Sequence, residues 1–264
     1  ICRCKDCGFQ FTHPVPVEAE IGRYYETPDY ISHSDTHKGL MNRVYHWVRR
    51  VMLARKARLV KHNSRLSQGS LLDIGTGTGY FRHFMQERGW HVSAIEKSPQ
   101  ARQFAKEHFE LDVAAPEALN EFADKSFDVI TLWHVMEHLE HLNETWETLK
   151  RILKDQGILI IAVPNPTSFD AEKYKEMWGA YDVPRHLWHF SPSVMQQFGA
   201  KHDFILCERH PMPFDAFYVS MLSEKYRKSA FPFIKGLITG SEAWIVSLAK
   251  KDRSSSMIYV FRKK

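Results

Sequence analysis

The chain has 264 residues, of which 44% are apolar and 25% are charged, which is the size and balance of a globular protein. No run of about 18 uncharged apolar residues occurs, and the first twenty positions lack the basic-then-apolar order of a secretory signal. These features argue against a membrane-spanning or secreted class. We therefore expect a soluble, cytoplasmic protein.

The net charge of +5 is concentrated in one stretch of the chain. Nine Lys or Arg residues and no Asp or Glu lie between Lys38 and Arg65. A single basic stretch indicates a nucleic-acid partner less strongly than a basic domain does, so nucleic acid is not the partner we expect. Three of the four cysteines are crowded at Cys2, Cys4 and Cys7, which is not a distributed disulfide framework and fits a reducing compartment.

The chain divides into an N-terminal extension, residues 1–36, and a main domain, residues 37–264. The main domain is expected to begin with a helix from His37 to about Ser67, in which apolar residues recur at helical spacing opposite a basic face. These apolar residues are Leu40, Val44, Trp47, Val48, Val51 and Leu59. We favour a helix that covers a ligand crevice and has a solvated basic face, and the alternative is a helix that lies on anionic lipid or nucleic acid.

From Ser70 onward, short apolar strands alternate with helices in the manner of a parallel α/β sheet. Strands are expected at 70–74, 91–95, 111–113, 127–132 and 157–163. Helices are expected at 79–89, 98–109, 144–153 and 191–201. Two last strands, 204–210 and 257–262, are expected to pair in antiparallel fashion although roughly 45 residues separate them, too many for a plain turn.

Residues 71–81, with the sequence LLDIGTGTGYF, predict a strand that enters a glycine-rich turn and then a helix. Glycine lets a ligand approach the main chain and tolerates positive φ, and the exposed amides at a helix N-terminus favour an anion. Dinucleotide enzymes use G-x-G-x-x-G at this place, whereas here Tyr80 stands at the third glycine position. Asp73, two residues before Gly75, is a second departure from the nicotinamide pattern.

Glu96 closes the second expected strand, at the edge of the sheet where strand ends open into the ligand crevice. A carboxylate there can accept hydrogen bonds from both hydroxyls of a ribose. An acidic residue after a strand is usually a solvated loop residue. Its combination with the glycine-rich turn favours the ribose role.

These motifs, together with the segment FDVITLWHVMEHL, resemble those of class I S-adenosylmethionine-dependent methyltransferases, and more narrowly the type 11/12/23 group related to ubiquinone-biosynthesis O-methyltransferases. The resemblance covers about residues 37–210. It implies an α/β, Rossmann-like seven-stranded sheet with helices on both faces and the last strand antiparallel, preceded by an N-terminal extension and interrupted by an insertion before the last strand. It also implies S-adenosyl-L-methionine as cofactor and S-adenosyl-L-homocysteine as product.

The same resemblance implies roles for individual residues. The methionine part would be held by Asp73, Gly75, Thr76, Gly77, Thr78, Gly79 and Tyr80. The ribose would be held by Glu96 beside Lys97, and the adenine by residues from Ala115 to Glu117. Trp133 and His134 would flank the methionine part and face the acceptor. Many relatives carry an acidic residue where this chain has Ala114, Ala115 and Pro116, so backbone amides would substitute there.

Methyl transfer requires alignment, exclusion of water and in some cases removal of a proton, but no covalent enzyme nucleophile. His134, Glu137, His138 and His141 fall at helical separations just beyond the fourth strand, and they are the leading candidates for proton transfer. The structural alternative is that His138 is a buried, hydrogen-bonded histidine and His141 a solvated one.

A metal site is the alternative for this cluster, since some relatives place an E-x-x-E-H group here to hold Mg²⁺ or a similar ion. His134 replaces the first carboxylate in this chain. Imidazole suits softer metals than Mg²⁺, so we expect no metal at this position.

Residues 180–192, with the sequence AYDVPRHLWHFSP, resemble segments that border the acceptor pocket in the same group. Arg185 could hold an anionic acceptor, and His186 or His189 could act as a base. The structural alternative is that the segment only caps and packs the next helix, through Trp188, Phe190, Ser191 and Pro192. The catalytic candidates are therefore His134, His138, Arg185 and His186.

Both ends of the chain carry further features. Residues from Cys4 to Phe11 resemble the second knuckle of a zinc ribbon, but a first C-x-x-C is absent before Ile1. Cys4 and Cys7 are thus weak zinc candidates, with an improvised site that adds Cys2 and His13 as the alternative, and zinc is expected only with a complete ribbon. The aromatic-rich insertion 212–251 is expected to be an acceptor lid or an oligomerisation surface, as in a homodimer.

The sequence thus predicts transfer of a methyl group from S-adenosylmethionine to an oxygen, nitrogen or carbon atom of a small-molecule acceptor. An RNA or protein methyltransferase is one alternative. Against it, the N-P-P-Y type tetrapeptide of base-amine methyltransferases is missing after the fourth strand, where residues 132–135 read LWHV. A catalytically silent S-adenosylmethionine-binding protein is the other.

Overall fold

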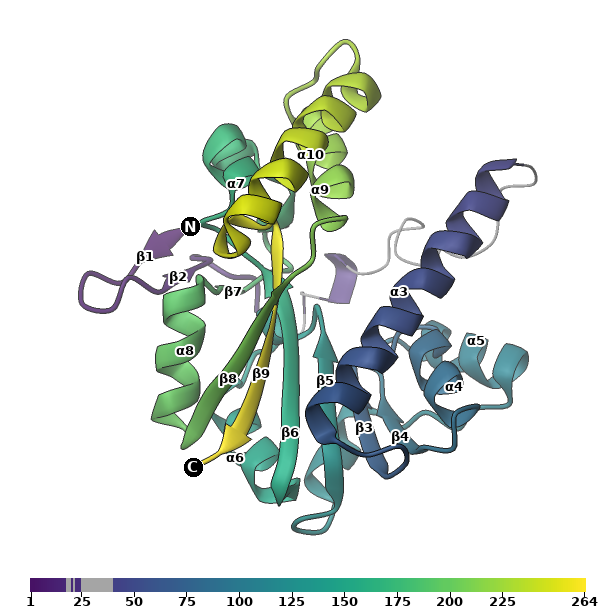
Figure 1. The fold of residues 1–264 in the computed structure, drawn as a ribbon. Coiled ribbons are helices and arrows are strands. Elements are labelled where there is room, and N and C mark those ends of the chain that lie inside the picture. Colours follow the sequence, from purple (N-terminus) through teal and green to yellow (C-terminus); the bar gives the residue numbers. More distant parts are fainter. Residues whose placement is uncertain (18–19, 21, 25–39) are drawn as a thin grey trace.

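A computed structural model describes residues 1–17, 20, 22–24 and 40–264 (Figure 1). Its centre is a mixed sheet flanked by helices, in which β5 and β6 lie in the middle and the two C-terminal strands, β9 and β8, lie at one edge. The strand order is β4 (His91–Ile95), β3 (Ser70–Ile74), β5 (Phe127–Trp133), β6 (Leu153–Pro164), β9 (Ser256–Lys263) and β8 (Phe204–Pro211). β9 is antiparallel to both of its neighbours, as expected for the last strand.

The strand expected at 111–113 does not form. One isolated bridge, from Ile95 to Ala114, marks its place beside β4, so the sheet has six strands among the described residues rather than seven. Leu111 and Val113 are nevertheless buried, against Ala94 and other residues of that edge. Proline cannot donate to a ladder, and Pro116 opens a 3₁₀ helix, η2 (Pro116–Asn120), directly after the bridge.

The strands and helices follow the expected alternation closely. The helices around the sheet are α3 (Leu40–Ser64), α4 (Tyr80–Gln86), α5 (Pro99–Phe109), α6 (Leu142–Ile152) and α8 (Pro192–Lys201). The side chains of Ser98 and Ser191 cap α5 and α8, because each accepts a hydrogen bond from the backbone N–H three residues later. The predicted start of α3, at residues 37–39, lies outside the described residues.

Alternate residues of the central strands face opposite sides of the sheet, which gives two core layers. Leu72 and Ile130 pack with α6 and α8 on one face. Leu71 and Val129 pack with α3 and α4 on the other face. Both layers are fully buried at these positions, so the carboxyl ends of β3, β4 and β5 are held at one edge of a rigid sheet.

The N-terminal extension is joined to the main domain by a small second sheet. Its strands are β1 (Cys2–Arg3), β2 (Gln10–Phe11) and β7 (Trp188–His189), each antiparallel to the next. Phe9 packs on Trp188 and Phe190, with ring centroids 5.6 and 5.1 Å apart. The segment before β2 therefore supports the loop that precedes α8.

The insertion between β8 and β9 is a pair of helices, α9 (Asp215–Tyr226) and α10 (Pro232–Ala249), beside α7 (Phe169–Tyr174) (Figure 1). Gly236 and Gly240 let the two helices approach closely, because a Cβ added at either would lie within 2.8 Å of a Cα atom of α9.

No helix in the described part of the chain combines the length and apolar character needed to cross a membrane. The remaining 3₁₀ turns are η1 (Gly22–Tyr24), η3 (Met136–His138), η4 (Lys175–Met177), η5 (Gly179–Tyr181) and η6 (Lys251–Arg253).

Candidate functional site

The glycine-rich turn between β3 and α4 has three glycines in the left-handed region, with φ of 68° at Gly75, 57° at Gly77 and 85° at Gly79. A Cβ at Gly75 would lie 2.3 Å from Val135, so this glycine is required by packing within the protein. A Cβ at Gly77 would meet no protein atom within 4 Å. The backbone at Gly77 therefore faces open space, as a ligand-binding turn must.

Glu96 lies beside this turn, at the end of β4, and its side chain is buried. One carboxylate oxygen accepts a hydrogen bond from the Gly77 N–H at 2.8 Å, and the other accepts from the Ser98 N–H at 2.9 Å. A carboxylate oxygen has two lone pairs, so each oxygen can accept a further hydrogen bond. The fold itself thus positions Glu96, the residue predicted to bind a ribose, against the glycine turn.

Asp73, at the end of β3, is also buried, and its carboxylate accepts a hydrogen bond of 2.6 Å from the Thr131 hydroxyl. Burial raises the pKa of Asp73 to about 6, although the hydroxyls of Thr131 and Thr76 and the positive charge of Lys56 act in the opposite direction. A carboxylate with this pKa is mostly ionised at neutral pH and can bind a cationic amine.

Lys56, from α3, reaches into the same region, which the sequence analysis did not anticipate. Its ammonium lies 4.4 Å from the centroid of the Trp133 ring, and burial lowers its pKa while Asp73 and Asp215 oppose that shift. Arg49, seven residues before Lys56 on the same helix, has its guanidinium carbon 3.9 Å from the centroid of the Tyr80 ring. The basic face of α3 is therefore only partly solvated.

The solvated part of the basic face of α3 consists of four exposed side chains, those of Arg50, Arg55, Arg58 and Lys61. The sequence did contain a signal that Arg49 and Lys56 face inward. They stand at helical spacing from Val60, which is buried, and residues separated by three, four or seven share a face of a helix. The apolar stripe expected on α3 is likewise interrupted, because Trp47 is 66% exposed.

The remaining cofactor candidates divide into two groups. Ala115 is half-buried and adjoins the end of β4, where the Glu96 N–H donates to the Ala114 carbonyl at 3.0 Å. Thr76, Thr78 and Tyr80 are half-buried in or beside the glycine turn. Lys97 instead forms an exposed ion pair with Glu140 at 3.0 Å, and Glu117 is exposed. The structure brings the first group to the turn and not the second.

A buried polar atom without a partner at this edge of the sheet fits a site that a ligand completes. The Nε1 atom of Trp133, the last residue of β5, is buried and has no hydrogen-bond partner among the described residues. β5 is the neighbour of β3, which leads into the glycine turn. Buried polar groups without partners are rare unless a ligand or water completes them.

His134 follows β5 in the left-handed region, with φ of 58°. Its Nε2 lies 3.2 Å from Asp215 at the start of α9, and its Nδ1 lies 3.5 Å from Glu137. Burial lowers the pKa of His134, but the two carboxylates more than offset this and raise the pKa to about 10. A histidine that is protonated at neutral pH cannot act as a base, so His134 contributes a positive charge.

His134, Glu137, His138 and His141 stand at helical separations in the sequence, but they do not lie on one continuous helix. His134 has positive φ and Val135 has non-helical angles, so only one turn, η3, forms before α6 begins at Leu142. His141 is exposed, as its solvated interpretation predicted. His138 is half-buried and lies in the one turn that does form.

His138 and His186 meet edge to face, with ring centroids 4.5 Å apart. The Nδ1 atom of His138 lies 3.0 Å from the Arg185 carbonyl, and that of His186 lies 2.9 Å from the Ala180 carbonyl. A carbonyl can only accept, so both Nδ1 atoms carry a proton, and in a neutral imidazole the Nε2 atom then has a lone pair. Burial, and then the neighbouring His138, lower the pKa of His186 well below its usual value, so His186 is neutral at pH 7.

Glu137 completes this group. Its side chain is 1% exposed, and among the described residues its carboxylate faces Nδ1 of His134 at 3.5 Å, without a shorter hydrogen bond. Ligand atoms of Glu137, His138 and His186 all lie within 4.8 Å of one another. One carboxylate and two imidazoles suit a borderline transition metal better than Mg²⁺, and an ion held there would lower the pKa of a bound hydroxyl.

The 180–192 segment serves two purposes. In its first half, Arg185 donates to Asp182 at 2.7 Å, which partly neutralises the charge that was expected to hold an anionic acceptor. In its second half, Trp188 donates to the Leu139 carbonyl, and Phe190 is fully buried. The structural interpretation therefore holds for residues 188–192, and the site interpretation remains for Arg185 and His186.

Thr12 of the N-terminal extension fixes this loop, a contact with no signal in the sequence. Its hydroxyl donates to the His186 carbonyl at 2.6 Å and lies 3.1 Å from Nε2 of His189. Burial lowers the pKa of His189 to about 4, so His189 is a neutral structural residue. The extension thus positions the backbone of His186.

The cysteines of that extension do not assemble a metal site. Cys2, Cys4 and Cys7 are free thiols, and no group of three or more ligand side chains in the described ranges includes them or His13. The zinc knuckle therefore stays a prediction. In the structure, the hairpin of β1 and β2 that carries these cysteines supports β7.

Comparison with known proteins identifies the family. A family model described as a methyltransferase domain matches residues 44–207. An uncharacterized methyltransferase of Staphylococcus carnosus is 33% identical over 112 residues, which are 42% of this chain and 53% of that protein. The mitochondrial ubiquinone biosynthesis O-methyltransferase of Schizosaccharomyces pombe is 27% identical over 134 residues, 48% of this chain and 49% of that protein. The chain spans about half the length of these curated relatives.

Solved structures show the same fold at low sequence identity. Phosphoethanolamine N-methyltransferase 2 of Haemonchus contortus, in complex with S-adenosyl-L-methionine, has a TM-score of 0.55 and 22% identity over 79% of this chain and 52% of that chain. The 1,6-didemethyltoxoflavin-N1-methyltransferase of Burkholderia thailandensis, with S-adenosylhomocysteine bound, has a TM-score of 0.57 and 12% identity over 97% of this chain and 95% of that chain. The matched family model covers more than half of the chain, and the protein therefore belongs to the methyltransferase-domain family.

Proposed function

We propose that this protein transfers the methyl group of S-adenosylmethionine to an oxygen, nitrogen or carbon atom of a small-molecule acceptor. The observation that carries the proposal is the glycine turn, which is open to a ligand at Gly77 and bordered by the buried carboxylate of Glu96. A ribose would bind Glu96, and the methionine amine and carboxylate would meet Asp73 and Lys56. S-adenosylmethionine supplies a methyl group that is bound to a sulfonium sulfur. When the methyl group is transferred, the leaving group is the neutral thioether S-adenosylhomocysteine.

The acceptor side is formed by the loop after β5, the 180–186 loop and the first turns of α9. His186 is neutral, and its Nε2 has a lone pair and lies 3.7 Å from Asp182, so it can accept a hydrogen bond from an acceptor hydroxyl or amine and orient it. Its lowered pKa makes it a weak base. The cation of His134 and the ion pair of Arg185 with Asp182 offer charge that can orient an acceptor. α9 would then act as an acceptor lid, since Asp215 binds His134 and Ser223 binds the Gly179 N–H.

The proposed acceptor is a small molecule rather than RNA, and the proposed setting is the cytoplasm. Two basic side chains of α3, Arg49 and Lys56, face aromatic rings of the cofactor region, so they are not presented to a phosphate backbone. All four cysteines are free, which fits a reducing compartment. RNA affinity that falls steeply with salt would revive the nucleic-acid alternative.

Conversion of S-adenosylmethionine to S-adenosylhomocysteine, measured with a panel of hydroxyl and amine metabolites, tests the proposal. We expect one acceptor class to raise turnover well above the solvent background. His186→Asn should abolish that increase while cofactor affinity is unchanged, and His141→Asn, at an exposed position, is the matched control. Cofactor binding with no acceptor-dependent turnover would instead identify a silent binding protein.

A further inference from the structure

Helix α10 has the reverse of the usual arrangement of side chains on a surface helix. The face that packs on α9 is built from small residues, Gly236, Thr239, Gly240, Ala243 and Ser247, all buried. The face turned to solvent carries large apolar residues at spacings of three and four, each 48–62% exposed: Ile234, Leu237, Ile238, Ile245 and Leu248. A helix of a soluble protein normally buries such a stripe, so this apolar stripe indicates a contact surface.

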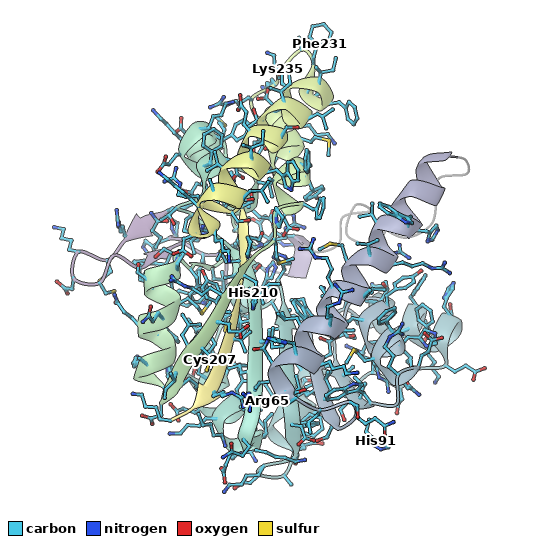
Figure 2. All side chains as sticks on the ribbon, in the orientation of Figure 1. Arg65, His91, Cys207, His210, Phe231 and Lys235 are labelled. Atoms are coloured by element: carbon cyan, nitrogen blue, oxygen red, sulfur yellow. The ribbon has the colours of Figure 1, made fainter. Side chains whose placement is uncertain are left out.

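The turn between α9 and α10 adds aromatic and basic side chains to the end of the stripe. Phe231 and Phe233 are 64% and 62% exposed there. Figure 2 places Phe231 and Lys235 at the outer end of the helix pair, on the opposite side of the molecule from Arg65 and His91. Between residues 225 and 235 the chain has four exposed basic residues and no acidic one: Lys225, Arg227, Lys228 and Lys235.

The acidic groups of this region are turned inward or paired. Glu224 is buried, and Glu242 forms an ion pair with Lys173 of α7. A cavity at the base of the turn is lined by Lys173, Glu224, Arg227, Ser229, Lys235, Ile238 and Thr239. Three cations and one carboxylate line it, and Ile238 joins it to the apolar stripe. A cationic recess beside exposed aliphatic side chains matches a phosphate headgroup beside its acyl chains.

We propose that the α9–α10 pair docks on the surface of an anionic phospholipid bilayer, with the apolar stripe at the acyl boundary and the basic turn among the phosphates. Amphipathic helices with a basic edge bind lipid in this way, through buried apolar area and attraction to anionic headgroups. The four basic residues of the turn favour an anionic surface over a second copy of this equally basic turn.

Docking would also bring the acceptor side to the bilayer. α9 starts at Asp215, which holds His134, and its other end reaches the basic turn. A lipid-dissolved acceptor could then enter the site beside α9. This last step rests on the proposed methyl transfer, whereas docking itself does not.

Vesicle flotation with the full chain tests docking without any activity measurement. We expect the protein to float with phosphatidylcholine vesicles that contain phosphatidylglycerol, weakly with phosphatidylcholine alone, and less as salt rises. Lys228→Gln and Lys235→Gln should each lower partitioning about fivefold, because a basic residue near such a surface contributes about 1 kcal/mol. Lys106→Gln, exposed on α5, should leave partitioning unchanged.

A second pair of variants tests the apolar stripe. Leu237→Glu should abolish flotation, and Ile205→Glu, at a position 50% exposed on β8, should not. Both positions are on the surface, and circular dichroism will verify the fold. Absence of flotation by the wild type, or equal flotation of Leu237→Glu, would overturn the proposal. So would concentration-dependent dimerisation without lipid that Leu237→Glu removes, since the stripe would then be covered by a second copy.

Discussion

Glu96 lies at the end of β4 with its carboxylate buried against the glycine turn. Its place at a strand end was enough to suggest a ribose ligand, and the structure adds two hydrogen bonds, to Gly77 and Ser98, that hold the carboxylate. The role of Asp73 was instead implied by the resemblance to class I methyltransferases. The orientation of these groups follows from parallel strands that end at one edge, which sequence periodicity can predict.

Replacement of Glu96 by alanine should weaken binding of S-adenosylmethionine without unfolding the protein. Loss of hydrogen bonds to an ionised group costs about 2 kcal/mol, or roughly 30-fold in Kd. Calorimetric titration measures this directly, and Glu107→Ala, at an exposed position on α5, is the control. Unchanged affinity in Glu96→Ala would remove this residue from the site.

Two glycines of one turn should respond differently to alanine. Gly77→Ala faces open space, so it should cost only about 1 kcal/mol of stability from its positive φ yet abolish cofactor binding. Gly75→Ala places a methyl group 2.3 Å from Val135 and should cost about 1–3 kcal/mol more. Chemical denaturation and titration of both variants check this, and cofactor binding by Gly77→Ala equal to the wild type would contradict it.

The roles of histidines could not be predicted at the residue scale. His134, His138 and His186 were all candidates, but the protonation of His134 depends on Asp215 of α9, and that of His186 on its burial, while Thr12 of the N-terminal extension holds the His186 backbone. Asp215 and Thr12 are distant from these histidines in sequence, and neither lies in a recognisable motif. A single sequence therefore supplied the residue types at the site but not which of them carries a charge.

At the scale of elements, α3 was expected to cover a ligand crevice with its basic face solvated, and the structure instead places Arg49 and Lys56 of that face against the rings of Tyr80 and Trp133. Lys56→Met should weaken binding of S-adenosylmethionine about tenfold, because it removes a cation beside Asp73 and Trp133. Titration across pH gives a second readout. Wild-type affinity should fall as pH drops below about 6, where Asp73 is protonated, and Lys56→Met should move this midpoint upward.

Arg58→Met, exposed on the same helix, is the matched control for that experiment. Methionine has a similar length to lysine and suits a buried position, so the fold should be retained. Equal affinity and an equal midpoint in Lys56→Met would show that this lysine takes no part in the cofactor site.

The contact between β5 and α9 should make stability depend on pH. The pKa of His134 is raised to about 10 in the folded protein, above the value of about 6.5 expected for an unfolded chain. Its contribution is therefore fully present below pH 6.5 and is lost as pH rises toward 10. Asp215→Asn should lower thermal stability at pH 7 and flatten its decline between pH 7 and 10, as differential scanning calorimetry would measure.

Strand and helix boundaries were predicted well because the apolar runs and the Ser-Pro caps are local signals, as at Ser98 and Ser191. The helical spacing of residues 134–141 corresponds to a single 3₁₀ turn, because His134 is left-handed and such a conformation is set by tertiary contacts. The strand predicted at 111–113 does not form. Its apolar residues pack as predicted, but Pro116 has no N–H to extend the backbone hydrogen bonding beyond one bridge.

At the scale of the molecule, the carboxyl ends of β3, β4 and β5 lie at one edge of the sheet, and segments far apart in sequence contact the loops there. The N-terminal extension holds His186 through Thr12, and α9 holds His134 through Asp215. The six strands, with β9 antiparallel between β6 and β8, are the frame that brings these segments together. The aromatic composition of 212–251 indicated a functional insertion, but not that its apolar face would point outward.

The central claim is that the space at the glycine turn receives S-adenosylmethionine, and calorimetric titration of the folded protein tests it most directly. We predict saturable binding of one S-adenosylmethionine per chain and no heat with NAD. A binding isotherm with NAD, or no heat with S-adenosylmethionine from protein whose fold is verified, would contradict the account.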